Sequence, residues 1–292
     1  MNKAVQNYPK AVILFFITML IFASQDGISK YLAGQYNAMS IVMIRYWAFA
    51  IFVLALVSRQ NGIKSAAKTN MPFLQLGRGI LLGAQVILAA YQFAELGLVN
   101  THVVFASYPV FVTLFSIPIL GEKVGWARGL AVLSGFLGVV VIVQPGSSVF
   151  DPMSLLPLLS AALFAMYNIM TRYVARSDSG ETSFFWTEIG GLSISSLISP
   201  FFWSMPQGMD WVWMLILCIT GAGGHYTMIK ALEIAEASSL QPFSYLQLLF
   251  ASMIGVFVFG EVITIPIVVG GGIIVSAGLF TIWRERRKSQ LA

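Results

Sequence analysis

The stretch KAVILFFITMLIFASQDGISKY, residues 10–31, decides the fold class of this chain. An α-helix needs about 20 mostly apolar residues to cross the hydrocarbon core of a membrane, and this stretch has that length. Nine further stretches of the same kind follow, separated by short connections, and we expect all ten to be membrane-spanning helices. They cover residues 38–58, 72–95, 101–120, 124–144, 154–174, 182–204, 210–231, 238–259 and 262–283.

The composition of the chain is that of a membrane protein. Of its 292 residues, 58% are apolar and 10% are charged, whereas a soluble domain carries about 25% charged residues. The mean hydropathy is +0.81. The net charge of +5 is spread along the chain, so we expect no nucleic-acid partner. The sequence has no nucleophile, metal or phosphate-loop motif, and we expect no enzymatic activity, no metal and no cofactor.

The distribution of basic residues predicts the topology. Ten spans place both termini on one side of the membrane, and that side holds 14 of the 17 basic residues, whereas the opposite side holds only Lys30. Cytoplasmic loops carry the excess of Lys and Arg, so we expect both termini in the cytoplasm. The 14 residues are Lys3, Lys10, Arg59, Lys64, Lys68, Lys123, Arg128, Arg172, Arg176, Lys230, Arg284, Arg286, Arg287 and Lys288.

Two short motifs recur in the same order. Ser29–Ala33 (SKYLA) matches Thr171–Ala175 (TRYVA), and the pair Gly121-Glu122 matches Gly260-Glu261. The matches lie 142 and 139 residues apart, which corresponds to a repeat of five spans. Five is odd, so the second copy must cross the membrane in the opposite sense. Inverted repeats of this kind place a substrate site at their interface near the membrane midplane.

We therefore expect an all-α integral membrane protein made of two inverted five-helix repeats, residues 1–148 and residues 149–292, the second ending in a basic cytoplasmic tail. With its paired Gly-Glu motifs, Pro109 and Arg45, the whole chain resembles the EamA family of the drug/metabolite transporter superfamily. It departs from the family pattern at Leu248, where a proline is expected opposite Pro109.

The resemblance implies an alternating-access transporter in a bacterial inner membrane that exports small amphipathic metabolites. Within the family the chain is most similar to exporters of aromatic and other amino acids, so we expect an amino-acid substrate, contact with membrane lipid, and a monomer or weak homodimer. Two alternatives remain open. One is an exporter of cationic drugs or other metabolites on the same fold, and the other is an integral-membrane enzyme that acts on lipid.

Polar residues inside the spans indicate a shared cavity. Arg78, Gln85 and Gln92 are seven residues apart, which places them within about 40° of one another on one helix face. The polar side chains of such a stripe either line a cavity or form hydrogen bonds to another helix. A single aromatic residue in a span likewise either lines a cavity or packs in the core. The candidate cavity residues are Gln25, Gln85, Gln92, Tyr91, Tyr108, Tyr167, Asn168, Trp186, His225 and Tyr245.

Ionisable residues form one layer near each membrane face. At about 1.5 Å per residue, Asp26 and Arg45 lie roughly 8–10 Å from the outer ends of their spans, and Arg78 and Glu188 about 9 Å from the inner face. Asp26 with Arg45 is a candidate outer gate, and Glu188 with Arg78 a candidate inner gate; the alternative is that both pairs are permanent ties. Asp26, Glu188 or His225 is also a candidate for proton coupling.

Overall fold

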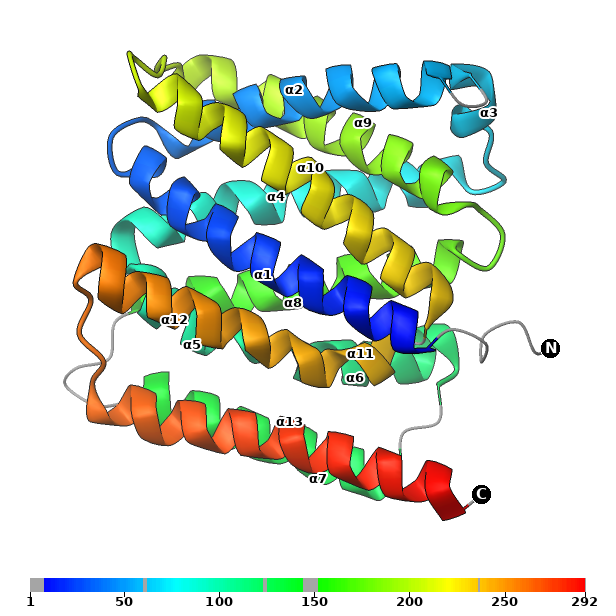
Figure 1. Ribbon diagram of the computed structural model, residues 1–292, viewed down its shortest axis with the longest axis vertical. Coiled ribbons are helices and arrows are strands. Elements are labelled where there is room, and N and C mark those ends of the chain that lie inside the picture. The colour runs from blue at the N-terminus through cyan, green and yellow to red at the C-terminus, as the bar shows by residue number, and fades with distance from the viewer. Residues whose placement is uncertain (1–7, 60–61, 123–124, 144–151, 236, 292) are drawn as a thin grey trace.

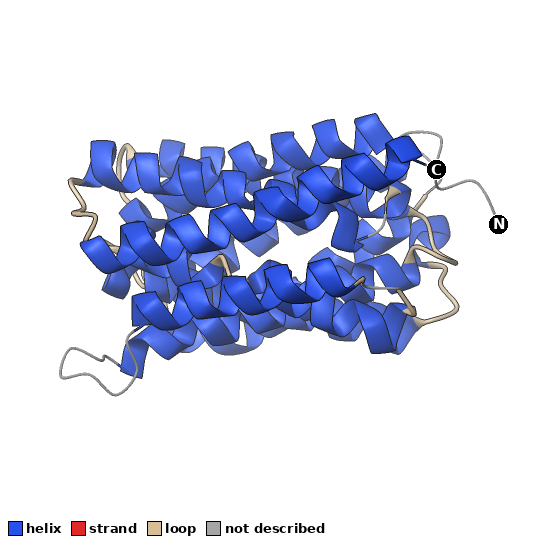
Figure 2. Ribbon diagram, turned by 90° about the horizontal axis from the view of Figure 1, so that it is seen from below, coloured by secondary structure: helices blue, strands red, loops and turns tan. Residues whose placement is uncertain are grey.

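The structure is a computed structural model that describes residues 8–59, 62–122, 125–143, 152–235 and 237–291. These residues form helices and connections without any β-strand (Figure 2). The helices are α1 (Tyr8–Ala33), α2 (Ala38–Arg59), α3 (Ile63–Ala67), α4 (Pro72–Leu96), α5 (Leu98–Phe105), α6 (Tyr108–Leu120), α7 (Trp126–Val143), η1 (Pro152–Ser154), α8 (Leu155–Val174), α9 (Gly180–Ile198), η2 (Ser199–Phe202), α10 (Asp210–Ile234), α11 (Ala237–Leu240), η3 (Gln241–Ser244), α12 (Tyr245–Phe259) and α13 (Ile265–Leu291).

The long helices lie side by side, and the connections gather at the two ends of the bundle (Figures 1 and 2). Helix α1 begins and α13 ends at the same end, which we call the terminal end. The opposite end, where α1 leads into α2, is the α1–α2 end. A chain that starts and finishes at one end crosses the bundle an even number of times, in agreement with an even number of spans.

Each of the ten predicted spans contains helix in the structure. Six helical stretches of the described residues are long and apolar enough to cross a membrane, and α12 and parts of α7 and α13 are shorter apolar helices. The protein is therefore an all-helical, multi-pass membrane protein. Ten crossings and cytoplasmic termini remain predictions. The six stretches are Tyr8–Ala33, Ala38–Ala55, Pro72–Leu96, Leu98–Leu120, Pro152–Val174 and Asp210–Ile234.

Helix contacts follow the same pattern in the two halves of the chain. Helix α1 packs against α10 and α12, and α8, which follows it by five predicted spans, packs against α4 and α6. In the same way α2 contacts α10, and α9 contacts α4. Helices α2 and α9 contact each other, as do α7 and α13, which form a pair at one edge of the bundle (Figure 1). In each pair of contacts, α1, α2 and α10 take the places of α8, α9 and α4. A two-fold relation between the halves requires this pattern.

The two Gly-Glu motifs have the same local structure. Gly121 and Gly260 follow α6 and α12 with φ of 69° and 66°, a left-handed conformation that glycine adopts without steric cost. The N–H groups of Glu122 and Glu261 then donate to carbonyls six residues earlier, at 3.2 and 3.0 Å. Both helices therefore end at a glycine with positive φ, and the N–H that follows the glycine pairs with a carbonyl near the end of the helix.

The predicted fourth and ninth spans are both interrupted. The fourth is divided into α5 and α6 at Ala106 and Ser107, just before Pro109. The ninth is divided by the 3₁₀ turn η3, which contains Pro242. Leu248, expected to mark the equivalent of Pro109, lies instead within α12, so the absence of a proline there does not remove the break. Paired broken helices are frequent beside transporter binding sites, where they expose backbone groups to the cavity.

Candidate functional site

A central cavity lies between helices of the two halves. Most of its lining residues lie in the parts of their helices nearer the α1–α2 end. Its volume of about 50 Å³ suits a few water molecules, so the cavity must widen to admit a metabolite. The lining residues are Phe22, Gln25, Asp26, Ser29, Arg45, Gln85, Val86, Ala89, Ala90, Gln92, Phe93, Thr101, His102, Phe105, Ser160, Phe164, His225 and Gln247.

The acidic group of the cavity is Asp26 of α1. Its Oδ2 accepts a hydrogen bond of 2.9 Å from Nε2 of Gln247, at the start of α12. Nε2 of His102, on α5, lies 3.1 Å from the same oxygen. The His102 ring stacks on Phe93 of α4, with the ring centroids 5.3 Å apart. Asp26 therefore connects four helices, two of which flank the breaks described above.

The basic group of the cavity is Arg45 of α2. Its Nη2 lies 3.3 Å from Nε2 of His225, on α10. Arginine can only donate, so this nitrogen of His225 accepts and the imidazole is neutral, with its proton on Nδ1. The guanidinium also lies 5.1 Å from the centre of the Phe49 ring. The cavity therefore holds groups of opposite charge on α1 and α2.

Many polar atoms around the cavity lack a partner. Gln85 donates to Ser160 at 2.9 Å, but single polar atoms of other lining residues are buried without a hydrogen bond among the described residues. Buried polar groups in proteins are nearly always satisfied, so a cluster of unsatisfied ones indicates a place where a polar ligand or water binds. The unsatisfied atoms are Oε1 of Gln25, both amide atoms of Gln92, Oε1 of Gln247, Nε of Arg45 and Nδ1 of His225.

Aromatic rings form much of the remaining wall. Phe164 of α8 lies 6.3 Å from Phe22 and 5.6 Å from Phe105, measured between ring centroids. Phe93 completes the wall beside His102. Rings of this kind bind the faces of flat, conjugated molecules.

Six of the fourteen residues that the sequence indicated lie on this cavity: Gln25, Asp26, Arg45, Gln85, Gln92 and His225. Three more form its outer layer. Tyr108 packs at 5.2 Å from both Phe105 and Phe164. Tyr167 stacks 6.1 Å from Phe164, and Asn168 donates to the Phe164 carbonyl at 2.7 Å.

Three indicated residues lie elsewhere. Tyr91 is 43% exposed on the outside of α4. The indole N–H of Trp186 donates to the carbonyl of Ala67, at the end of α3. Tyr245 lines an apolar groove between α12 and α13 rather than the central cavity.

The two candidate gate pairs are not joined in this conformation. Asp26 and Arg45 both line the cavity, but each has other partners, as described above. Arg78 donates to Gln75 Oε1 and Thr171 Oγ1, both at 2.9 Å, and to the Ser183 carbonyl. Glu188, the expected partner of Arg78, is 1% exposed and has no hydrogen bond among the described residues.

The sequence analysis missed His102 and Gln247 as partners of Asp26. His102 could have been found from its depth in the membrane. It lies one turn into α5 from the α1–α2 end, and Asp26 lies near the same end of α1. Gln247 carried no comparable signal. Its place opposite Asp26 depends on the packing of α12 against α1, which hydropathy does not reveal.

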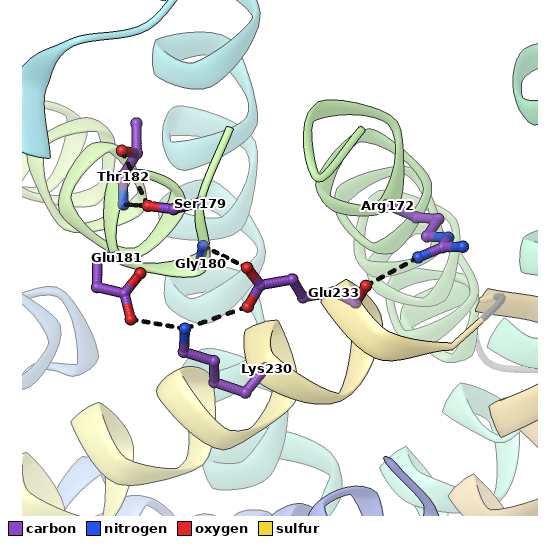
Figure 3. A network of polar contacts seen from close by, with 7 residues as sticks. All are labelled: Arg172, Ser179, Gly180, Glu181, Thr182, Lys230 and Glu233. Carbon is purple, nitrogen blue, oxygen red and sulfur yellow. Dashed lines mark hydrogen bonds and ion pairs between the residues drawn. The ribbon is translucent and has the colours of Figure 1, made fainter. Parts of the chain in front are cut away.

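At the terminal end, a polar network joins α8, α9 and α10 (Figure 3). Lys230 donates to Glu181 at 2.6 Å and to Glu233 at 3.1 Å, and Glu233 accepts the N–H of Gly180. Arg172 donates to the Glu233 carbonyl at 3.2 Å. Burial opposes the charge of Glu181, but the hydrogen bond from Lys230 outweighs it and lowers the pKa of this carboxyl. The network ties these three helices together at the terminal end.

The sequence model of the EamA-like transporter family matches residues 9–144 and, a second time, residues 152–283. The chain belongs to this family. The resemblance to EamA transporters seen in the sequence is thereby confirmed, and the protein is a transporter rather than an enzyme.

Three relatives of this EamA protein cover nearly its whole length. An S-adenosylmethionine uptake transporter of Rickettsia prowazekii is 27% identical over 98% of this chain and 97% of its own. A riboflavin transporter of Vibrio cholerae is 29% identical over 98% of both chains. The pseudopaline exporter CntI of Pseudomonas aeruginosa is 26% identical over 91% of this chain and 93% of its own.

A solved crystal structure has the same fold. It superposes with a TM-score of 0.74 and 19% identity, over 96% of this chain and 100% of the other. The relatives are consistent with a small-metabolite substrate. Their names do not support the narrower expectation of an amino-acid substrate, and they include both uptake and export.

Proposed function

We propose that this EamA protein is an alternating-access transporter that takes up S-adenosylmethionine, or a closely similar zwitterion with a flat base, through the central cavity. The observation that carries the proposal is the set of unsatisfied donors and acceptors around a cavity with both an acidic and a basic residue. S-adenosylmethionine has a carboxylate, two cationic centres and an adenine ring. Each has a complementary group on the cavity wall.

The assignments follow from charge and shape. Arg45 receives the carboxylate, because a guanidinium offers paired donors that match it. Asp26 receives the ammonium or sulfonium group, and the amides of Gln25, Gln92 and Gln247 bind the polar edges of the base and ribose. The phenylalanine rings stack on the adenine face. The name of the Rickettsia relative supports uptake over the export that the sequence resemblance implied.

We also propose the architecture predicted from the sequence: ten crossings as two inverted repeats, residues 1–148 and 149–292, with cytoplasmic termini in the inner membrane. The exchanged helix contacts, the two Gly-Glu caps and the double match of the family sequence model support it. Rocking of one half against the other opens the cavity to each side in turn.

A second candidate substrate is riboflavin, favoured by the aromatic wall and by the Vibrio relative. Riboflavin has a flat ring but no fixed charge, so its binding does not need the charge of Asp26, whereas binding of S-adenosylmethionine does. An export role for amino acids or cationic drugs is less well supported, because none of the relatives described above is named for either.

The test is counterflow in proteoliposomes loaded with unlabelled substrate. Wild-type protein exchanges labelled S-adenosylmethionine, and Asp26→Asn reduces this exchange tenfold or more, the effect of about 1.4 kcal/mol for a lost charge pair in a cavity. Glu95→Asn, a change at an exposed carboxylate on α4, is the matched control. Exchange of riboflavin that Asp26→Asn leaves intact, with no exchange of S-adenosylmethionine, would establish the second candidate instead.

A further inference from the structure

Glu188 is a buried carboxylate without a partner. It lies in the middle of α9, 1% exposed, and neither of its oxygens has a hydrogen bond among the described residues. Placing an ionised carboxylate in such surroundings carries a large desolvation penalty, so the group either forms an ion pair or takes up a proton. The described residues form no ion pair with Glu188, so its surroundings in this conformation favour the neutral, protonated side chain.

The elements packed around α9 bring several titratable groups toward Glu188. Helix α2 contributes Arg45 and Tyr46, α4 contributes Arg78, and α8 contributes Tyr167. On α10, His225 contacts Arg45. The Tyr46 ring packs directly on Gly191, one turn from Glu188, and its hydroxyl has no partner among the described residues. The Glu188 side chain thus lies within electrostatic range of two guanidinium groups, those of Arg45 and Arg78.

The two arginines differ in their freedom. Arg78 is fixed by three hydrogen bonds, to Gln75, Thr171 and Ser183, and its guanidinium lies 5.6 Å from the centre of the Tyr167 ring. Arg45 has one long hydrogen bond, to His225, and a contact with the Phe49 ring, and its Nε has no hydrogen bond among the described residues. Arg45 also lines the central cavity. Arg45 is therefore the cation whose guanidinium can turn from the cavity toward Glu188.

We propose that Glu188 is the proton-binding residue of the transport cycle and that its proton controls Arg45. A metal cation is a poor occupant, because Arg45 and Arg78 both repel positive charge at this point. With Glu188 protonated, Arg45 is available to the anionic group of a substrate in the cavity. When Glu188 releases its proton to the terminal end, its carboxylate attracts Arg45, which then leaves the substrate's anionic group.

This scheme rests on the proposed function and gives it a driving force. One proton enters with each substrate molecule, bound on Glu188 from the α1–α2 side and released as a hydrated proton at the terminal end. The empty carrier returns with Glu188 and Arg45 paired, so that no net charge is buried. The pair then separates when Glu188 is protonated again. The predicted coupling is proton symport.

The first test uses Glu188→Gln, a fixed mimic of the protonated state, in proteoliposomes with labelled S-adenosylmethionine. The variant retains counterflow, which needs only the loaded carrier, and loses accumulation driven by an inward proton gradient. The matched control is Glu181→Gln, seven residues earlier on α9, which keeps both. If Glu188→Gln accumulates substrate like the wild type, or loses counterflow as well, Glu188 is not the coupling residue.

The second test does not depend on the substrate. Infrared spectra of the purified protein at neutral pH contain the carbonyl band of a protonated carboxylic acid, which Glu188→Gln removes and Glu181→Gln retains. An unchanged band in Glu188→Gln would overturn the proposal. A wild-type protein that fails to exchange S-adenosylmethionine but shows this band would refute the proposed substrate and leave the proton site standing.

Discussion

Lys30, near the end of α1, donates to the carboxylate of Glu261, which follows α12. The same carboxylate accepts the backbone N–H groups of Leu98 at 2.8 Å and Val99 at 2.7 Å, at the start of α5. Glu261, in the second half of the chain, thus caps the N-terminus of α5, in the first half. The helix dipole favours a negative charge at this position. The recurring motifs of the sequence, SKYLA and Gly-Glu, meet in this contact.

Glu261→Gln removes the charge from this contact and keeps its size. Hydrogen bonds to a charged group contribute about 1.5–3 kcal/mol each in favourable sites, and less where water screens them, so we expect a loss of about 1–3 kcal/mol. The measurement is the melting temperature in detergent. Glu95→Gln, at an exposed site on α4 near the same end, is the control and leaves the melting temperature unchanged.

The same contact predicts a pH dependence of stability. Burial opposes the charge of Glu261, but the hydrogen bonds from Lys30, Val99 and Leu98 outweigh it, and the pKa of the carboxyl is lowered from its ordinary 4.5. The stabilisation is fully present above the ordinary value and is lost as the pH falls through the lowered one. The melting temperature of the wild type should fall more steeply below pH 4.5 than that of Glu261→Gln. Parallel curves would contradict the assignment.

Gly190→Ala tests the closest approach of two helices. A Cβ atom at Gly190 would lie 2.6 Å from backbone atoms of Gly79, so α4 and α9 would have to separate. Overpacking of this kind is destabilising by about 1–3 kcal/mol. Gly77→Ala, on α4 where a Cβ meets no atom within 4 Å, is the control. Equal melting temperatures for both variants would show that the helices are not in contact as described.

The predicted topology has a direct labelling test. Cys218, the single cysteine of the chain, is first replaced by serine, and a new cysteine is placed at Gln35 or at Ser177, in connections at opposite ends of the bundle. Ten crossings with cytoplasmic termini predict that a membrane-impermeant maleimide labels Gln35→Cys in intact cells and leaves Ser177→Cys unlabelled. The reverse pattern would place the termini outside.

Hydropathy was sufficient to place the helices along the chain, because a span is defined by its own residues. The interruption of the ninth span was not predicted. The sequence showed only that Leu248 stands where a proline is expected opposite Pro109, whereas the turn is at Gln241–Ser244, so the two halves are not aligned residue for residue.

The candidate site was predicted less completely, because it depends on the rotation and packing of helices. Gln85 and Gln92, two members of the predicted stripe on one face of α4, lie on the central cavity. Tyr91 precedes Gln92 and is therefore turned by about 100° from that face, and it lies at the surface. His102 and Gln247 lie beside Asp26 only because α5 and α12 pack against α1.

The neighbouring residues Tyr91 and Gln92 give the most direct test of the central cavity as the binding site. Counterflow of labelled S-adenosylmethionine is measured in proteoliposomes with the wild type, Gln92→Ala and Tyr91→Ala. We predict that Gln92→Ala reduces exchange tenfold or more, the effect of about 1.4 kcal/mol for lost hydrogen bonds to the substrate, and that Tyr91→Ala exchanges like the wild type. Full exchange by Gln92→Ala together with loss in Tyr91→Ala would contradict the account, since it would place the substrate outside the cavity.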